Sequence, residues 1–238
     1  MKKDFWLMGE VIHGDYSRWV NEEMLHSVTN YELHKSLYSG LNDHNFFEIA
    51  HNVRRLEAIG TKLYTFVDNH DENRIASKLL KKEHLPLAYL LLFTLPGIPS
   101  IYYGGEWAVE GMRTKYSDVE LRPAIPIANS KKLHCDLTDQ ITKLSEIHSA
   151  NSEYAGGRYQ ELLLTNRQYA FARHNKGSVV ITAANNDDNQ SSLSIPVPIS
   201  AKTAENLMDD SIIPIKDGRL SITLSGNEGV VLKIREDQ

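Results

Sequence analysis

The sequence predicts an α/β fold followed by a smaller all-β part, and two observations support this division of the 238-residue chain. Up to about residue 150, short apolar runs alternate with segments whose apolar residues recur every three or four positions, which is the order strand, helix, strand, helix. Beyond that point the apolar runs are short and partly alternating, and turn formers such as Asn175-Lys176-Gly177 separate them. We therefore expect a parallel α/β domain over residues 1–152 and a small antiparallel β-sandwich over residues 153–238.

The first part is expected to contain short buried strands at 5–11, 28–31, 63–67 and 97–104, because each is an apolar run of suitable length. Apolar periodicity predicts helices at 17–26, 45–59, 85–95 and 136–149. Gly60 is expected to cap the second of these helices, and Pro86 is acceptable in the first turn of the third. Strands joined by helices imply right-handed parallel crossovers, as in an α/β sheet or barrel.

The second part is expected to contain strands at 159–164, 169–173, 179–184, 193–197, 220–224 and 230–234. Many short strands at close spacing without intervening helices are typical of a small antiparallel sandwich.

The composition excludes several classes of partner. The net charge is −5 and the basic residues form no long run, so neither nucleic acid nor an anionic membrane surface is an expected partner. The apolar stretch 85–103 carries three prolines and reads as helix, turn and strand rather than a membrane span. The single cysteine, Cys135, excludes an internal disulfide framework and is expected to be an inert thiol. Localisation is left open, although the lack of disulfides is compatible with the cytoplasm.

Acidic residues and a histidine follow two of the expected strands. Glu10 ends the first, and Asp68-Asn69-His70-Asp71 follows the third. The C-terminal ends of parallel strands face one side of a sheet, so these side chains are expected to meet. Glycoside hydrolysis needs two carboxyl groups, one of which donates a proton and has its pKa raised by burial. Glu10 suits the donor, Asp71 the ionised partner and His70 a hydrogen-bond donor to a sugar hydroxyl; loop and helix-cap roles are the alternative.

Four segments resemble motifs of the α-amylase family of glycoside hydrolases. GEVIHGDY (9–16) resembles the segment with the acid/base glutamate, and FVDNHD (66–71) resembles the segment with the transition-state-stabilising aspartate and a sugar-binding histidine. LPGIPSIYYGGE (95–106) is similar to the last barrel strand and its loop, while NYELHKSLYSGL (30–41) fits a strand-to-helix stretch. The resemblance covers essentially the whole chain and implies the C-terminal half of a (β/α)₈ TIM barrel followed by a β-sandwich.

The resemblance implies an enzyme acting on α-glucans or maltooligosaccharides with retention, through a covalent glycosyl intermediate and without an organic cofactor. It implies that Glu10 is the general acid/base, Asp71 the stabiliser and His70 a sugar ligand. Two further residues would lie near the substrate groove, although each could equally be a structural contact: Arg74 and Tyr103. Two aromatic residues could stack on a sugar or simply pack: Trp19 and Trp107. No metal ligand is expected in this chain, because the family's calcium site would lie mainly in the N-terminal half.

One part of the family pattern is not matched. A retaining mechanism needs a nucleophilic carboxylate, and the family's nucleophile precedes the acid/base glutamate, with an arginine two positions ahead of it. The residues before Glu10 contain only Asp4, with Lys2 before it. The chain alone is therefore expected to be inactive, and its open sheet edges predict self-association or pairing with an N-terminal half-barrel. The alternative is a non-catalytic carbohydrate-binding or interaction protein of the same fold, which requires no upstream nucleophile segment.

Overall fold

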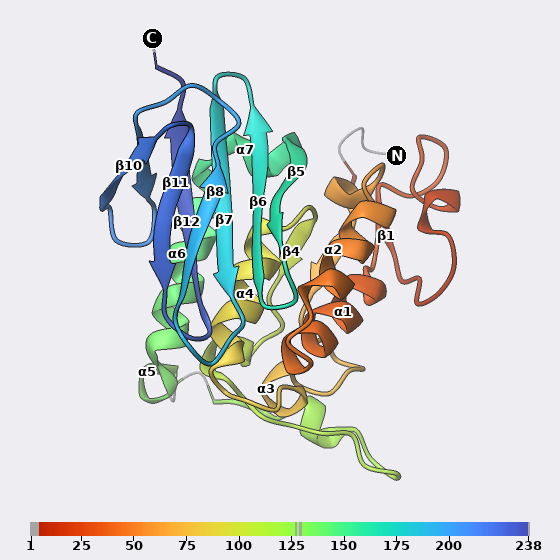
Figure 1. The fold of residues 1–238 in the computed structure, drawn as a ribbon. Helices are drawn as coiled ribbons and strands as arrows, with labels where there is room; N and C mark the ends of the chain where they lie inside the picture. Colours follow the sequence, from red (N-terminus) through yellow and green to blue (C-terminus); the bar gives the residue numbers. More distant parts are fainter. Residues whose placement is uncertain (1–4, 127, 129, 238) are drawn as a thin grey trace.

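The computed structural model describes residues 5–126, 128 and 130–237 (Figure 1). Its first part contains the short strands β1 (Met8–Gly9), β2 (Ser27–Val28), β3 (Tyr64–Phe66) and β4 (Ile98–Ser100). β1 pairs with β2 and β3 pairs with β4, both in parallel, and a parallel bridge between Thr29 and Tyr64 joins the two pairs. Strands β1, β3 and β4 lie inside their predicted ranges but are shorter. The strand predicted at 28–31 is mostly wrong, because β2 shares only Val28 with that range and Tyr31 begins a helix.

The α-helices have the following bounds: α1 (Tyr31–Asn42), α2 (Phe46–Arg55), α3 (Ile75–Lys78), α4 (His84–Thr94), α5 (Ser130–Leu133), α6 (Asp136–Ala150) and α7 (Ser152–Gly156). Short 3₁₀ turns occur at η1 (Tyr16–Arg18), η2 (Gly60–Lys62), η3 (Gly105–Trp107) and η4 (Val119–Leu121). The helices predicted at 85–95 and 136–149 are confirmed within one residue by α4 and α6. Among the described residues, no helix has the length and apolar character needed to span a bilayer.

The helix predicted at 17–26 is wrong. Only the 3₁₀ turn η1 forms there, because side chains bond the local backbone instead of leaving it to a helix. The carboxylate of Asp15 accepts from both the backbone nitrogen (3.0 Å) and the hydroxyl (2.6 Å) of Ser17. The Asn21 side chain likewise accepts from a backbone nitrogen two residues on, at 3.0 Å. This polar segment therefore stays a loop.

The prediction that Gly60 caps a helix is also wrong. Helix α2 ends at Arg55 with Leu56 as its C-cap, and Gly60 begins η2. A Cβ atom on Gly60 would lie 3.4 Å from the Cβ of Pro96. Gly60 thus lies beside Pro96 at the start of a 3₁₀ turn rather than at a left-handed helix end.

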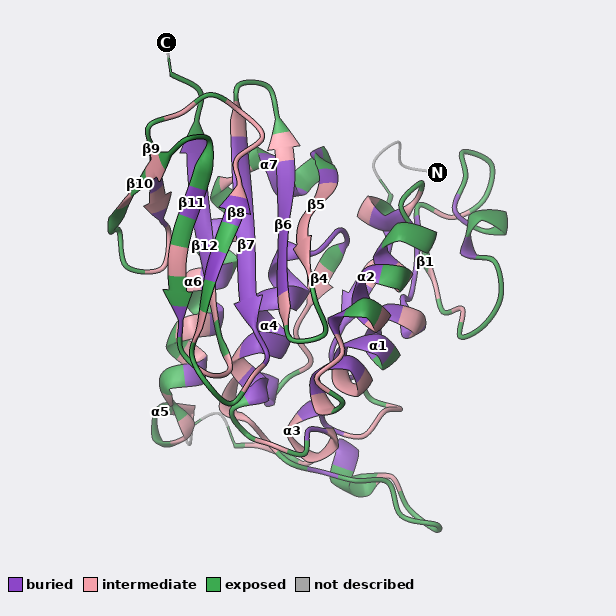
Figure 2. Cartoon of the chain, in the orientation of Figure 1, coloured by how far each residue is buried: buried purple, intermediate pink, exposed green. Residues whose placement is uncertain are grey.

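Helix α4 is at the centre of the main hydrophobic core. Ten of its 11 residues are buried. The core joins leucines of α4 to Phe46 of α2, to Leu144 of α6 and to residues of the second part such as Tyr169 and Val231. In Figure 2 the helix is buried along almost its whole length, behind the antiparallel strands. The two predicted parts therefore share one core, and the boundary at residue 152 stays a prediction.

The second part is one hydrogen-bonded series of eight strands in the order β5-β6-β7-β12-β9-β10-β11-β8. The strands have these bounds: β5 (Arg158–Leu164), β6 (Gln168–Asn175), β7 (Ser178–Asn185), β8 (Ser191–Pro196), β9 (Thr203–Asn206), β10 (Ile212–Lys216), β11 (Arg219–Leu224) and β12 (Glu228–Arg235). Every assigned pairing in it is antiparallel. The six predicted strands are confirmed, and β9 and β10 were missed.

The series curls back on itself instead of forming two separate sheets. A second core cluster contains Ile195 of β8 and Leu220 of β11 together with Ile181 of β7 and Leu232 of β12. Strands β8 and β11 therefore lie over β7 and β12 with apolar side chains between them, and Figure 1 shows the ribbons of β8 and β11 beside that of β7. A two-layered β structure was expected, but its layers are continuous through β9 and β10.

Buried charges fasten α7 to this sheet. Arg173 of β6 is fully buried and donates to the carbonyl oxygens of Tyr154 and Gly157. Glu153 of α7 is also fully buried and lies 2.5 Å from the ammonium nitrogen of Lys233 on β12. These contacts fix the junction between the helical part and the sheet.

Candidate active site

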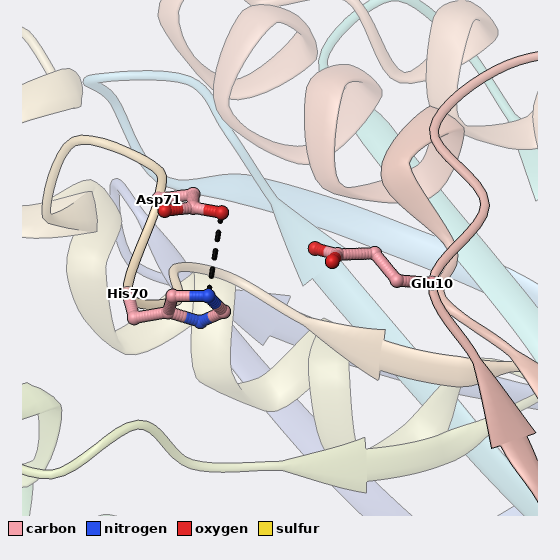
Figure 3. A group of neighbouring side chains, drawn as sticks. All are labelled: Glu10, His70 and Asp71. Atoms are coloured by element: carbon pink, nitrogen blue, oxygen red, sulfur yellow. Dashed lines mark ion pairs between the residues drawn. The ribbon is translucent and has the colours of Figure 1, made fainter.

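Three of the predicted site residues converge in space. Glu10 follows β1, while His70 and Asp71 lie in the loop after β3, and one potential ligand atom of each lies within 4.8 Å of the others. Figure 3 shows the Glu10 side chain extending towards the His70 and Asp71 side chains from the opposite side. Glu10 and His70 also line a pocket of about 290 Å³ at the ends of the parallel strands. The expected meeting of strand ends is thus observed.

Glu10 is held by a tyrosine that the sequence did not single out. The hydroxyl of Tyr31, the first residue of α1, donates to Glu10 Oε1 at 2.9 Å and accepts from Asn69 Nδ2 at 3.0 Å. Burial raises the pKa of Tyr31 to about 12, so the hydroxyl keeps its proton near neutral pH. Tyr31 therefore bridges the two strand ends.

Glu10 itself is exposed, which differs from the expected burial of a proton donor. The backbone around it is nevertheless fixed. Thr29 Oγ1 accepts from the backbone nitrogen of Val11 at 2.9 Å and donates to its carbonyl oxygen at 3.2 Å. The strand end is thus ordered, while its carboxylate lies on the open side of the sheet.

The loop after β3 is shaped by its own polar residues. Asn69 Oδ1 accepts from the backbone nitrogens of Asp71 and Glu72, both at 2.9 Å, which makes a tight turn. Asp68 is buried and accepts from the backbone nitrogen of Ile75 at 3.0 Å, at the start of α3. Burial raises the pKa of Asp68 to about 6. Asp68 and Asn69 therefore fix the conformation of this loop, while His70 and Asp71 belong to the candidate site.

Asp71 lies among cationic groups. Its carboxylate is 3.3 Å from His70 Nε2, 3.0 Å from the guanidinium of Arg122 and 3.8 Å from that of Arg113. Arg122 also donates to the carbonyl oxygen of His70 at 3.0 Å. The segment that contains both arginines follows η3, so it folds back over the loop after β3.

Arg74 lies beneath the site rather than on its surface. Its side chain is fully buried, donates to the carbonyl oxygen of Tyr103 at 2.8 Å and stacks 4.3 Å from the centre of the Tyr102 ring. It has no surface with which to contact a substrate in this structure. Tyr103 is 42% exposed, and its hydroxyl donates to the carbonyl oxygen of Pro123 at 2.9 Å.

The remaining candidates are not gathered at this site. Trp19 is exposed on the loop after η1, and Trp107 ends η3; neither is among the described residues lining the pocket at the strand ends. Lys2 and Asp4 lie outside the described residues. Neither Tyr31 nor Arg122 was selected from the sequence. The motif NYELHKSLYSGL contains Tyr31, whereas Arg122 has no local signal because its partner Asp71 is 51 positions away.

Comparisons with known proteins agree on one family. A family model described as alpha amylase, catalytic domain, matches residues 1–156. A cyclomaltodextrinase of Thermoanaerobacter pseudethanolicus is 27% identical over 194 residues, covering 77% of this chain and 32% of the relative. A maltogenic alpha-amylase of Bacillus acidopullulyticus is 22% identical over 245 aligned positions, covering 98% of this chain and 41% of the relative. The chain thus spans well under half the length of these relatives.

Solved structures share the fold. An Anoxybacillus alpha-amylase superposes with a TM-score of 0.85 at 23% identity, covering 100% of this chain and 54% of that one. The alpha-amylase of Geobacillus thermoleovorans, in complex with acarbose, also superposes with a TM-score of 0.85, at 21% identity. At this level of identity the superpositions establish the fold alone.

Proposed function

The chain belongs to the α-amylase family of glycoside hydrolases, and from this premise we propose that it contributes the acid/base and charge-stabilising carboxylates to a retaining enzyme acting on α-glucans or maltooligosaccharides. The observation that carries the proposal is the convergence of Glu10, His70 and Asp71 within 4.8 Å at the ends of parallel strands. In this assignment Glu10 protonates the leaving glycosidic oxygen and later activates water. Asp71 balances positive charge on the sugar ring, and His70 donates to a hydroxyl.

Tyr31 and Arg74 act as positioning residues in this proposal. Tyr31 donates to Glu10 and so sets the direction of its carboxyl group. Arg74 donates to the carbonyl oxygen of Tyr103, and its guanidinium also contacts the Tyr103 ring. Both contacts lie on the loop after β4, so Arg74 joins the loop after β3 to the loop after β4. A shift of either loop by about 1 Å would reduce turnover strongly, because catalytic groups act only in aligned geometry.

Among the described residues, the proposed site lacks one group that a retaining mechanism needs. The cluster contains two carboxylates among the described residues, whereas a retaining mechanism needs a nucleophile besides the acid and the stabiliser. Glu10 is exposed, and a general acid gains its raised pKa from burial. We infer that one partner, which pairs with the open edges of the sheet, supplies both the nucleophilic carboxylate and the side chains that bury Glu10.

The parallel sheet has unpaired strand edges and exposed apolar side chains that could contact such a partner. In the described part of the chain, β1 and β4 each have a strand on one side only. Large apolar side chains are exposed near these two strands: Phe5 58%, Trp6 47%, Met8 39% and Ile98 37%. Unpaired strand edges with apolar neighbours readily join another sheet. An N-terminal half-barrel is the partner that would complete eight strands; a second copy of this chain would close the sheet in another way.

Binding and turnover can be measured on the purified chain. We expect maltopentaose to bind weakly by calorimetry, and His70→Ala or Asp71→Asn to weaken it about tenfold or more, since the first removes a hydrogen-bond donor and the second removes the charge of an acceptor. The exposed-carboxylate change Glu22→Gln is the matched control and should leave binding unchanged. Hydrolysis of a 4-nitrophenyl maltooligosaccharide should be absent at low protein concentration, where sedimentation shows a monomer.

Two results would contradict the proposal. Binding that is unaffected by both site variants would place the sugar elsewhere. Turnover by a monomer that survives Glu10→Gln would remove Glu10 from the acid/base role. Turnover that rises with protein concentration and disappears in Glu10→Gln would instead identify a second copy as the source of the nucleophile.

A non-catalytic sugar-binding role is the second candidate. The contact of Asp71 with Arg122, at 3.0 Å, favours it, because that ion pair occupies the carboxylate that would face the sugar ring. The two roles differ in one measurement. Addition of the completing half-barrel should produce turnover in the enzyme, and should change only affinity in a binding protein.

A further inference from the structure

A larger pocket lies apart from the candidate active site. Its volume is about 580 Å³, compared with about 290 Å³ at the strand ends, and none of its described lining residues is shared with that pocket. It lies where α3, the first turn of α4, the loop after η3 and the first turn of α6 meet. Six of its described lining residues have apolar side chains: Ala76, Leu79, Leu85, Pro86, Ala108 and Leu137. The volume is in the range of small-molecule pockets.

The pocket is an opening at the edge of the main core. Leu79, Leu85 and Leu137 belong to the core cluster and are each under a tenth exposed, and Ala76 and Ala108 pack against it. Water molecules in a pocket with apolar walls have few hydrogen-bond partners. If the pocket is empty, the side chains that line it lack dispersion contacts on the side that faces the space. A ligand that fills the space would recover those contacts.

The charges at the pocket select against an ionic ligand. Lys82 and Glu110 lie 3.1 Å apart and so neutralise one another. Asp136 is the first residue of α6, where its carboxylate offsets the partial positive charge of the helix N-terminus. An anionic ligand would therefore find no unpaired cation among the described lining residues, and a cationic ligand would find only Asp136, whose carboxylate already interacts with the helix N-terminus.

The lining also differs from that of a sugar subsite. Among the described lining residues there is no tyrosine, tryptophan or phenylalanine on which a pyranose ring could stack, and carbon atoms of aliphatic side chains dominate. The chemistry therefore points to an apolar molecule rather than to a second stretch of α-glucan.

We propose that the pocket between α3, α4 and α6 binds a neutral, largely apolar small molecule, such as a two-ring aromatic compound or an aliphatic body of similar size. This site is independent of the proposed sugar site, because the two share no lining residue. Binding there stabilises the fold, since the ligand fills space at the edge of the core that α4 and α6 share with the antiparallel sheet.

Cys135 provides a direct reporter of occupancy. It is the only cysteine of the chain, it is partly exposed, and it lines the pocket. Alkylation by iodoacetamide, in which the sulfur displaces iodide from carbon, can be followed by mass spectrometry. A ligand seated in the pocket covers the sulfur, so at ten times the dissociation constant the alkylation rate should fall about tenfold.

Three probes with one naphthalene body separate the possible ligand chemistries. Naphthalen-1-ylmethanol is neutral, naphthalene-1-sulfonate is an anion, and naphthalen-1-ylmethylammonium is a cation. We expect the alcohol to protect Cys135 with a dissociation constant on the order of 10⁻⁴ M, given its size, and each charged probe to bind at least about fivefold more weakly because its charge is desolvated without a partner. Maltotriose should give no protection.

Variants test whether the protection arises in this pocket. Ala76→Phe places a ring inside it and should abolish protection by the alcohol, while Ala150→Phe, the same change at an exposed position of α6, should leave protection intact. If Ala76→Phe does not fold, the comparison of the three probes on the unchanged chain still decides the matter.

The proposal is overturned if the alcohol gives no protection at millimolar concentration, if a charged probe protects better, or if protection survives in folded Ala76→Phe. Protection by maltotriose would make the pocket a sugar site instead. None of these readouts uses glycoside hydrolysis, so the outcome does not depend on the proposed function.

Discussion

Replacement of Tyr31 by phenylalanine tests whether the two strand ends are coupled through one hydroxyl. The change removes the bond to Glu10 Oε1 at 2.9 Å and the bond from Asn69 Nδ2 at 3.0 Å, and it keeps the ring, which packs edge-on against Phe66. A hydrogen bond to a charged group contributes about 1.5–3 kcal/mol and a neutral one about 1 kcal/mol. Glu10 is exposed and is solvated by water after the change, so the low-end sum of about 2.5 kcal/mol is an upper limit.

We therefore expect Tyr31→Phe to lower the free energy of unfolding by about 1–2 kcal/mol, and Tm by about 2–8 °C for a chain of this length. Urea denaturation followed by circular dichroism measures the first, and calorimetry the second. Tyr38→Phe is the matched control on the same helix, because the Tyr38 hydroxyl makes no hydrogen bond to a described residue. That control should change stability by less than about 0.5 kcal/mol.

A double-mutant cycle isolates the bridge. Tyr31→Phe combined with Asn69→Ala should cost less than the sum of the two single changes, by about 1 kcal/mol, because both remove the same hydrogen bond. The reasoning is refuted if Tyr31→Phe costs no more than Tyr38→Phe, or if the cycle is additive. The first result would mean that water replaces the hydroxyl without loss, and the second that the Tyr31–Asn69 hydrogen bond contributes nothing to stability.

Three further changes test other parts of the molecule. Burial raises the pKa of Asp68 from 3.8 to about 6, so the folded protein holds this proton more tightly than the unfolded chain. Its contribution to stability is therefore full below pH 4 and is lost as pH rises through 6. Urea denaturation at pH 4 and pH 7 should show a loss of up to about 3 kcal/mol that is absent in Asp68→Asn. Lys233→Met leaves the fully buried Glu153 without its cation, and thermal unfolding should show a loss of stability of about 3–4 kcal/mol. Adding Glu153→Gln should restore part of that loss, and no recovery would contradict the pairing. Gly105→Ala places a Cβ 2.4 Å from a buried tyrosine hydroxyl and should cost about 2 kcal/mol, whereas Gly156→Ala meets open space and should be neutral; equal urea midpoints would exclude a clash.

Local patterns predicted the regular elements well. The helices α4 and α6 have uninterrupted apolar character or periodicity over three or more turns, and their bounds follow directly from it. Segment 17–26 has helical spacing too, but polar side chains such as Asp15 bond the backbone there, and a periodicity argument does not weigh that competition. Strand β9 was missed because its four residues are mostly polar and owe their conformation to neighbouring strands.

The candidate site was predictable where it depends on strand ends. Glu10 and the loop from Asp68 to Asp71 were placed together because parallel strands aim their C-terminal ends at one side. The contacts between Asp71 and Arg122 and between Glu10 and Tyr31 join residues 51 and 21 positions apart, so they could be found only from the fold. The roles of the site residues stay predictions until binding and turnover are measured.

The shared core around α4 has a consequence for how the protein can be divided. A Cβ on Gly229 of β12 would lie 2.1 Å from a methyl carbon of Leu90, so the antiparallel sheet lies directly on the helix. Removal of the sheet at residue 152 would expose a leucine-rich helix surface to water and invite aggregation. The sheet thus acts as the outer cover of α4, and a truncated version lacking it should be insoluble even though every proposed catalytic group lies before the cut.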